Sequence, residues 1–154
     1  MKPSLSAGGG ESTPDPDVDG GDVRLIDTSV WIRADRKKQK EFQQRLKGLV
    51  IAGTAYICWP IHVELLIGAK DQDSFSSLDE QLSVLPHLPM TDKTWRESAN
   101  IGWKLARSGQ TVPPIDLLIA ATAIEHDMIL WTVDSDFKRV GAVVDLRADW
   151  FGLN

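Results

Sequence analysis

Short apolar runs alternate with helical segments along the chain from residue 23 onward, and this alternation limits the folds available to it. The expected strands are 23–27, 55–59, 128–133 and 141–146, with a proline-containing edge strand at 82–90. The expected helices are 36–51, 61–69, 74–83, 92–108, 114–126 and 134–140. Strands that alternate with helices predict a parallel sheet covered on both faces. We therefore expect an α/β fold with a central parallel sheet of about four to five strands.

The chain is expected to contain one folded domain, at 23–154, behind a tail at 1–22. The tail is rich in Gly, Pro, Ser and Asp. It cannot bury enough apolar surface to offset its ordering entropy, so we expect it to be disordered. The N-terminus has no secretory signal, and no apolar run approaches the roughly 18 residues needed to cross a membrane. A single cysteine, Cys58, allows no internal disulfide, which fits a cytoplasmic protein.

Four carboxylates fall where an apolar strand gives way to a turn or a helix: Asp27, Glu64, Asp116 and Asp134. A helix from 116 to 126 would travel roughly 16 Å, and the strand 128–133 would return roughly 20 Å. Asp116 and Asp134 are therefore expected at the same end of the sheet. Asp27 and Glu64 follow the carboxyl ends of two other expected strands, at the same edge of the sheet. Open α/β sheets bind their ligands outside this edge. The spacing predicts one shared acidic pocket.

Such a pocket has a definite chemistry. Several carboxylates within about 6 Å of one another raise each other's pKa values and cannot all ionise cheaply without a cation. Hard divalent cations such as Mg²⁺ and Mn²⁺ prefer oxygen ligands. A bound cation lowers the pKa of its water and neutralises charge at phosphorus. The pattern therefore indicates metal-dependent phosphodiester hydrolysis.

Most of these acids also have a purely structural interpretation. Asp27 could cap a helix, Asp116 could complement a helix dipole, and Asp134 could be an N-cap. Glu64 is harder to explain in this way, because its helix is otherwise apolar and a carboxylate there needs a partner.

Basic residues are concentrated in one segment, although the net charge is −5. Seven of the 17 Lys and Arg residues lie within 33–47: Arg33, Arg36, Lys37, Lys38, Lys40, Arg45 and Lys47. The segment is either a solvated helix face or a surface that holds a polyanion beside the acidic pocket. The three histidines are not spaced as a metal cluster, and no glycine-rich phosphate loop follows a strand.

Around the acids the sequence resembles PIN-domain ribonucleases, specifically the VapC-type toxins of type II toxin–antitoxin systems. The matching motifs run in family order over about 23–150: IDTSVWI at 26–32, VELLIG at 63–68, PPIDLLIAATA at 113–123 and TVDSDF at 132–137. The resemblance implies a PIN-like three-layer α/β/α sandwich. By position, it implies that the metal-binding acids are Asp27, Glu64, Asp116 and Asp134, and that Asp136 is a further catalytic acid.

The resemblance also implies an activity and partners. These are endonucleolytic cleavage of RNA with Mg²⁺, for which Mn²⁺ could substitute, and inhibition by a cognate VapB-like antitoxin. A homodimer and a toxin–antitoxin hetero-oligomer are implied as well. The residues expected to contact RNA are Arg33, Lys37, Lys38 and Lys40. The tail departs from the pattern, because such toxins usually begin at their first strand.

Two other readings remain open at this point. One is another acidic-site phosphotransfer enzyme. A Toprim-like site would use Asp134 and Asp136 but leave Asp27 unexplained, and a haloacid-dehalogenase-type site would need a second acid after Asp27. The other is a non-catalytic PIN-like interaction module, which would have no need for all of these acids.

Overall fold

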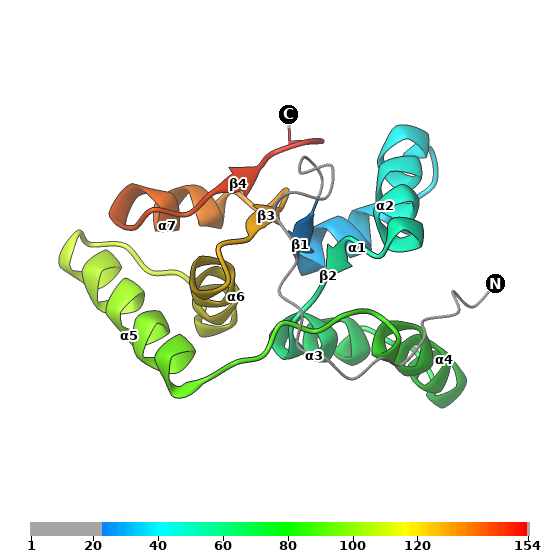
Figure 1. Ribbon diagram of the computed structural model, residues 1–154, viewed down its shortest axis with the longest axis horizontal. Helices are drawn as coiled ribbons and strands as arrows, with labels where there is room; N and C mark the ends of the chain where they lie inside the picture. The colour runs from blue at the N-terminus through cyan, green and yellow to red at the C-terminus, as the bar shows by residue number, and fades with distance from the viewer. Residues whose placement is uncertain (1–22, 154) are drawn as a thin grey trace.

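The computed structural model describes residues 23–153, and the tail predicted at 1–22 lies outside them. The sheet has four strands in the order β2-β1-β3-β4, and each neighbouring pair is parallel. The strands are β1 (Arg24–Ile26), β2 (Ala55–Tyr56), β3 (Ile129–Trp131) and β4 (Ala148–Asp149). The prediction of an α/β domain with a central parallel sheet is confirmed (Figure 1).

The six predicted helices are present in the described residues, and one further helix, at 28–34, was not predicted. They are α1 (Thr28–Ala34), α2 (Lys40–Ala52), α3 (Trp59–Ile67), α4 (Gln72–Ser83), α5 (Asp92–Arg107), α6 (Pro114–Glu125) and α7 (Asp136–Val143). Figure 1 shows the sheet between a layer formed by α1 and α2 and a second layer that includes α3 and α6. None of the helices in the described part of the chain is long and apolar enough to cross a membrane.

Alternate residues of β1 and β3 bury their side chains on opposite faces of the sheet, as the period of a strand requires. Ile26 and Trp131 pack with Val30 and the apolar side of α2. Leu25 and Leu130 belong to the larger core, which contains the apolar residues of α3, α5, α6 and α7. Both faces of the sheet are therefore covered, which makes the domain a three-layer sandwich.

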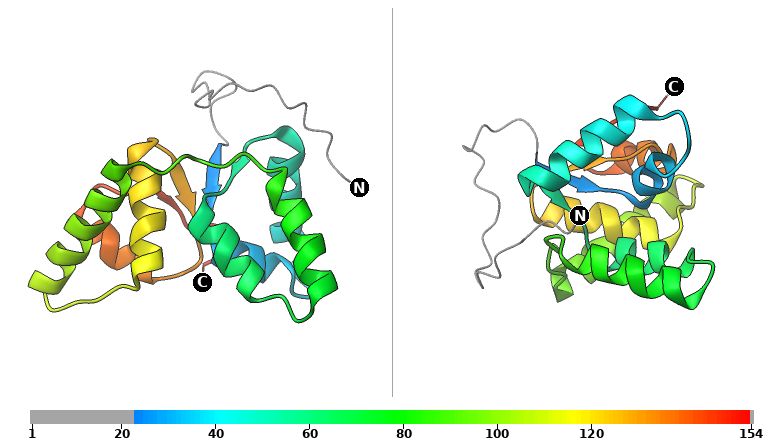
Figure 2. Two further views of the ribbon diagram at one scale, coloured as in Figure 1. Left: turned by 90° about the horizontal axis from the view of Figure 1, so that it is seen from below. Right: turned by 90° about the vertical axis from the view of Figure 1, so that its right-hand side faces the viewer.

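Helix α6 lies in the centre of the larger core and carries one of the predicted acids. Its residues from Asp116 to Ala123 are all buried, because α5 covers the side that faces away from the sheet. The two helices run side by side in the left view of Figure 2. A Cβ atom at Gly102 would lie 2.9 Å from Cδ1 of Leu117, so the glycine permits this close approach. The first turn of α6 is thereby held against α5.

Two of the predicted strands are wrong. Residues 141–143 belong to α7, and the last strand is Ala148–Asp149. The apolar residues Phe137, Val140 and Val143 have a spacing of three, and they turn one helical face toward the core. The edge strand predicted at 82–90 is reduced to a single bridge between Ile57 and His87, because residues 82–83 belong to α4.

Candidate metal centre

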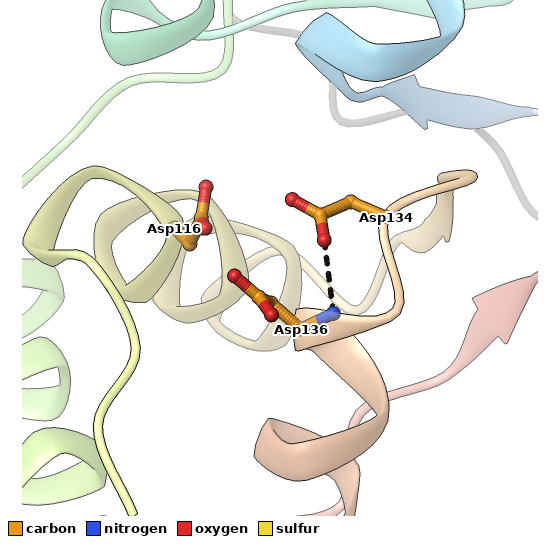
Figure 3. A group of neighbouring side chains, drawn as sticks. All are labelled: Asp116, Asp134 and Asp136. Atoms are coloured by element: carbon orange, nitrogen blue, oxygen red, sulfur yellow. Dashed lines mark hydrogen bonds between the residues drawn. The ribbon is translucent and has the colours of Figure 1, made fainter.

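Three acids converge at the carboxyl end of β3. Asp116 lies in the first turn of α6, Asp134 lies in the loop after β3, and Asp136 begins α7. One carboxylate oxygen from each lies within 4.8 Å of the others, and Figure 3 shows the three side chains around a shared space. The Asp136 backbone N–H donates to Asp134 Oδ1 at 2.9 Å, which orients the Asp134 carboxylate.

Asp27 approaches this group from the end of β1. It is the N-cap of α1 and is only 3% exposed. Its Oδ2 accepts hydrogen bonds from Ser29 Oγ at 2.5 Å and from Thr132 Oγ1 at 2.9 Å. Burial raises the pKa of Asp27, and these hydrogen bonds oppose that rise in part. The capping interpretation of Asp27 is therefore correct, and it is compatible with a place in the pocket.

Glu64 reaches the pocket from α3. Its Oε1 accepts a hydrogen bond from Thr28 Oγ1 at 2.8 Å, which ties α3 to the start of α1. Glu64 and Asp27 are not members of the three-acid group. Their charges nevertheless act on Asp116.

Asp116 has a strongly perturbed carboxyl group. Burial, together with the charges of Asp134, Asp27, Glu64 and Asp136, raises its pKa to about 7. Within residues 23–153, the one cation that pairs with any of these five acids is Arg139, which donates to Asp136. The negative charge at Asp116 and Asp134 is therefore not neutralised by the described protein groups.

Two hydroxyl residues that sequence reasoning did not single out connect the strand ends. Ser29 Oγ accepts from the Val133 N–H at 3.1 Å, and Thr132 Oγ1 accepts from the Asp134 N–H at 3.0 Å. Both hydroxyls also donate to Asp27, so one network sets the positions of the acids after β1 and β3. The sequence signal that could have identified these hydroxyls is a Ser two residues after Asp27 and a Thr two residues before Asp134.

None of the histidines is a member of the three-acid group, and two of them contact each other. His62 and His87 hydrogen-bond through Nδ1 and Nε2 at 2.8 Å, and His62 Nε2 lies 2.8 Å from Asp79 Oδ1. Trp59 stacks on His62 with ring centroids 4.7 Å apart. This chain of contacts joins α3 to α4.

The basic residues of the segment 33–47 have different surroundings in the structure. Arg33 donates to the Gly152 carbonyl, and its guanidinium lies 5.6 Å from the centroid of Phe42, so it anchors the C-terminal segment. Lys37, Lys38 and Lys40 are exposed. Arg33 was predicted to contact RNA, and in the structure its guanidinium contacts the C-terminal segment.

Comparison with known proteins decides the family. The sequence pattern of the PIN domain matches residues 24–143. The chain belongs to the PIN-domain family. It is 34% identical over 131 residues to VapC ribonuclease Mb1587 of Mycobacterium bovis, a match that covers 82% of this chain and 98% of the relative. Ribonuclease VapC18 of Mycobacterium tuberculosis is 27% identical over 132 residues, which cover 83% of this chain and 94% of the relative.

Solved structures of the same family share the fold of this PIN domain. VapBC2 from Rickettsia felis, bound to a DNA fragment from its promoter, aligns with a TM-score of 0.66 and 25% identity over 82% of this chain and 96% of that one. DNA-bound VapBC from Salmonella typhimurium aligns with a TM-score of 0.69 and 22% identity over 84% of this chain and 98% of that one. The chain thus spans nearly the whole length of the relatives that it matches.

The residues of this PIN domain fit a divalent cation. PIN-domain ribonucleases depend on a metal, and the three-acid group offers only oxygen ligands, which Mg²⁺ and Mn²⁺ prefer. The raised pKa of Asp116 means that the group must lose a proton before it can bind a cation near neutral pH. A cation would offset the repulsion that burial and the neighbouring acids impose there.

Proposed function

We propose that the protein is the toxin of a type II toxin–antitoxin pair and acts as a metal-dependent endoribonuclease. The observation that carries the proposal is the group formed by Asp116, Asp134 and Asp136, with Asp27 and Glu64 close enough to perturb it. The group lies in a chain that matches VapC ribonucleases along almost their full length.

The proposed metal ligands are Asp27, Glu64, Asp116 and Asp134, and the proposed cation is Mg²⁺, for which Mn²⁺ can substitute. When bound, the cation neutralises charge on the phosphate and lowers the pKa of the attacking water. Ser29 and Thr132 occupy Oδ2 of Asp27, which supports a role for its other oxygen as a ligand. Asp136 orients Asp134 through its backbone N–H and is proposed as an additional catalytic acid.

The RNA backbone needs cations that the acidic pocket does not offer. We assign this role to Lys37, Lys38 and Lys40, which are exposed at the turn before α2 and in its first residue. Arg33 is excluded from the assignment, because it holds the C-terminal segment.

The proposed protein partners are a cognate VapB-like antitoxin, in a toxin–antitoxin hetero-oligomer, and a second copy of the chain. The solved relatives named above are VapBC assemblies, which supports the antitoxin. Trp59, Val63 and Ile67 are exposed at intervals of four residues along α3, which supports a homodimer. Because the substrate is RNA, the proposed compartment is the cytoplasm.

The direct test is cleavage of RNA by the purified chain. We expect fragments of total RNA to appear with Mg²⁺ or Mn²⁺ and to be absent with EDTA, because the acids cannot act without a cation. Mapping the fragment ends after brief induction in cells would identify the RNA that is cut. Co-expression of a small neighbouring reading frame should suppress the cleavage. Intact RNA under all metal conditions would contradict the proposed activity.

Thr132→Val is expected to lower cleavage by roughly 10- to 100-fold, the usual scale for groups that orient metal ligands. The change removes one donor to Asp27 and leaves the Asp134 N–H without its acceptor, which costs stability of about 0.5–1.5 kcal/mol. The measurement is the cleavage rate as a function of Mg²⁺ concentration.

Two further variants separate orientation of the acids from general damage to the core. Thr132→Ser keeps the hydroxyl and should restore most of the activity. Thr122→Val is the matched control, because Thr122 is also fully buried and donates to the Leu118 carbonyl of its own helix at 2.7 Å. Equal loss of cleavage in Thr132→Val and Thr122→Val would contradict the orienting role.

A further inference from the structure

Helix α5 exposes two tryptophans that take no part in the core. Trp95 and Trp103 are 59% and 61% exposed. They lie eight residues apart, on one side of the helix and about 12 Å from each other, with the exposed Ala99 between them. The opposite side of α5 is buried through Ile101 and Leu105. Exposed aromatic side chains of this size indicate a binding surface rather than a packing requirement.

The sequence around Trp103 carries only positive charges, although the chain as a whole is acidic. No acidic residue occurs between Glu97 and Asp116. Lys104 and Arg107 are exposed and, in the part of the chain that the structure describes, form no ion pair. The Arg107 guanidinium lies 5.6 Å from the centroid of the Trp103 ring. An aromatic face and two unpaired cations thus share the last turns of α5.

This surface lies at the end of α5 that leads into α6, the helix that carries Asp116. Gly102 packs directly against Leu117, the residue after Asp116. A connection of only six residues, 108–113, joins the end of α5 to the start of α6. Figure 2 shows α5 and α6 side by side, and Figure 3 shows Asp116 at the beginning of α6. A strand bound at the acids can therefore continue onto the C-terminal half of α5.

We propose that Trp103, together with Lys104 and Arg107, forms a platform for single-stranded RNA next to the cleaved phosphate. An unpaired base stacks on the Trp103 indole, and the two cations contact the neighbouring phosphates. This inference rests on the proposed ribonuclease function and adds a determinant of substrate shape to it. A duplex would not expose a base for stacking, so the platform favours single-stranded segments.

Charge decides between RNA and protein as the occupant. The centres of protein interfaces are depleted in Lys, whereas single-stranded nucleic acid combines negative charge with flat bases. Lys104 and Arg107 follow Trp103 in a stretch of sequence that has no acid between Glu97 and Asp116, which matches the second pattern. Trp95 lies nearer to Asp92 and Glu97 and is excluded from the platform.

The test is binding of a short fluorescein-labelled single-stranded RNA of mixed sequence, measured by fluorescence anisotropy in Mg²⁺. An Asp116→Asn background keeps the RNA intact. We expect Trp103→Ala to weaken binding by roughly five- to 100-fold, the range for loss of one base–aromatic stack. Trp103→Phe should retain most of the affinity, and Trp103→Leu should not. Trp95→Ala is the matched control, with equal exposure on the same helix, and should bind normally.

The cations are tested by the salt dependence of the same binding. Lys104→Gln and Arg107→Gln should each reduce the slope of log affinity against log salt concentration by about 0.7, whereas Trp103→Ala should leave the slope unchanged. A Lys37→Glu, Lys38→Glu double variant tests the other basic segment in this assay. An unchanged slope there would assign that segment to the solvated surface.

The outcomes separate the platform from the enzyme. If the unmodified chain cleaves RNA and Trp103→Ala binds and cleaves equally well, the platform is wrong and the ribonuclease stands. If the unmodified chain neither binds nor cleaves RNA, the proposed function itself fails. If Trp103→Ala dissociates a dimer in sedimentation velocity, the surface belongs to a second copy and the platform is overturned. The thermal midpoint of each variant should stay near that of the unmodified chain, because Trp103 is exposed.

Discussion

Asp116→Asn is expected to abolish RNA cleavage and, at the same time, to stabilise the metal-free protein. Asparagine keeps the size of the side chain but removes a charged ligand from the three-acid group. Loss of one preorganised electrostatic group commonly costs about 100-fold or more in rate. The same change removes a carboxylate that burial and four neighbouring acids make costly to ionise. Above neutral pH, a catalytic loss should therefore accompany a gain in the free energy of unfolding.

Both effects can be measured on one preparation. Cleavage of total RNA in Mg²⁺ gives the activity, and thermal unfolding at pH 8 in EDTA gives the stability. Each kcal/mol should raise the midpoint by about 2–4 °C for a chain of this size. Asp145→Asn is the matched control, since Asp145 is exposed and is not a member of the acidic group, and it should change neither quantity. Full cleavage by Asp116→Asn, or a lower midpoint at pH 8, would contradict the assigned role.

The metal-free protein is expected to lose stability between about pH 4 and about pH 7. The pKa of Asp116 rises from 3.8 to about 7 on folding, so the native state binds more protons than the unfolded state in this window. Unfolding then becomes easier as the pH rises, and the loss is complete above about pH 7. Burial raises the pKa of Asp27 as well, which acts in the same direction. Asp149, whose pKa Arg45 and Arg24 lower, contributes stability that is lost only at more acidic pH.

A divalent cation should reverse this loss of stability. Mg²⁺ or Mn²⁺ is expected to raise the unfolding midpoint more at pH 8 than at pH 5, because at pH 5 the cation must displace a proton from Asp116. A concentration one hundred times the dissociation constant would add about 2.7 kcal/mol. Thermal melts with EDTA, MgCl₂ and MnCl₂ at the two pH values measure the difference, and Asp116→Asn should lose most of it. An equal shift at both pH values would show that the cation binds elsewhere.

Much of the fold could be predicted from the local sequence pattern, and the wrong predictions also have local causes. Alternation of strands and helices was sufficient for a parallel sheet, because only a crossover helix can connect parallel neighbours. The strand prediction at 141–146 was wrong because a run of Gly, Ala and Val is compatible with both helical and strand periodicity. The run became helical because Phe137, Val140 and Val143 meet the core on one helical face. Tertiary packing decided between the two periods.

The acidic site could be predicted from the sequence. Asp27 and Asp134 follow β1 and β3, whereas Glu64 lies inside α3 and Asp116 lies in the first turn of α6. The lengths of α6 and β3 bring Asp116 and Asp134 to one edge. Charge repulsion among acids placed in this way argues for a cation whatever their exact positions. The sequence by itself therefore determined the type of site and the edge of the sheet at which it lies.

The detailed arrangement was decided by tertiary structure alone. Parallel pairing of β1 with β3 brings Ser29 within 3.3 Å of Thr132, 103 residues away, and lets both hold the same oxygen of Asp27. The fold also brought Arg33 into contact with the C-terminal segment and left Trp103 exposed on α5. Periodicity reports only which side of its own element a residue occupies. Hydrogen-bond geometry and exposure depend on how distant elements pack, so only the tertiary structure could decide them.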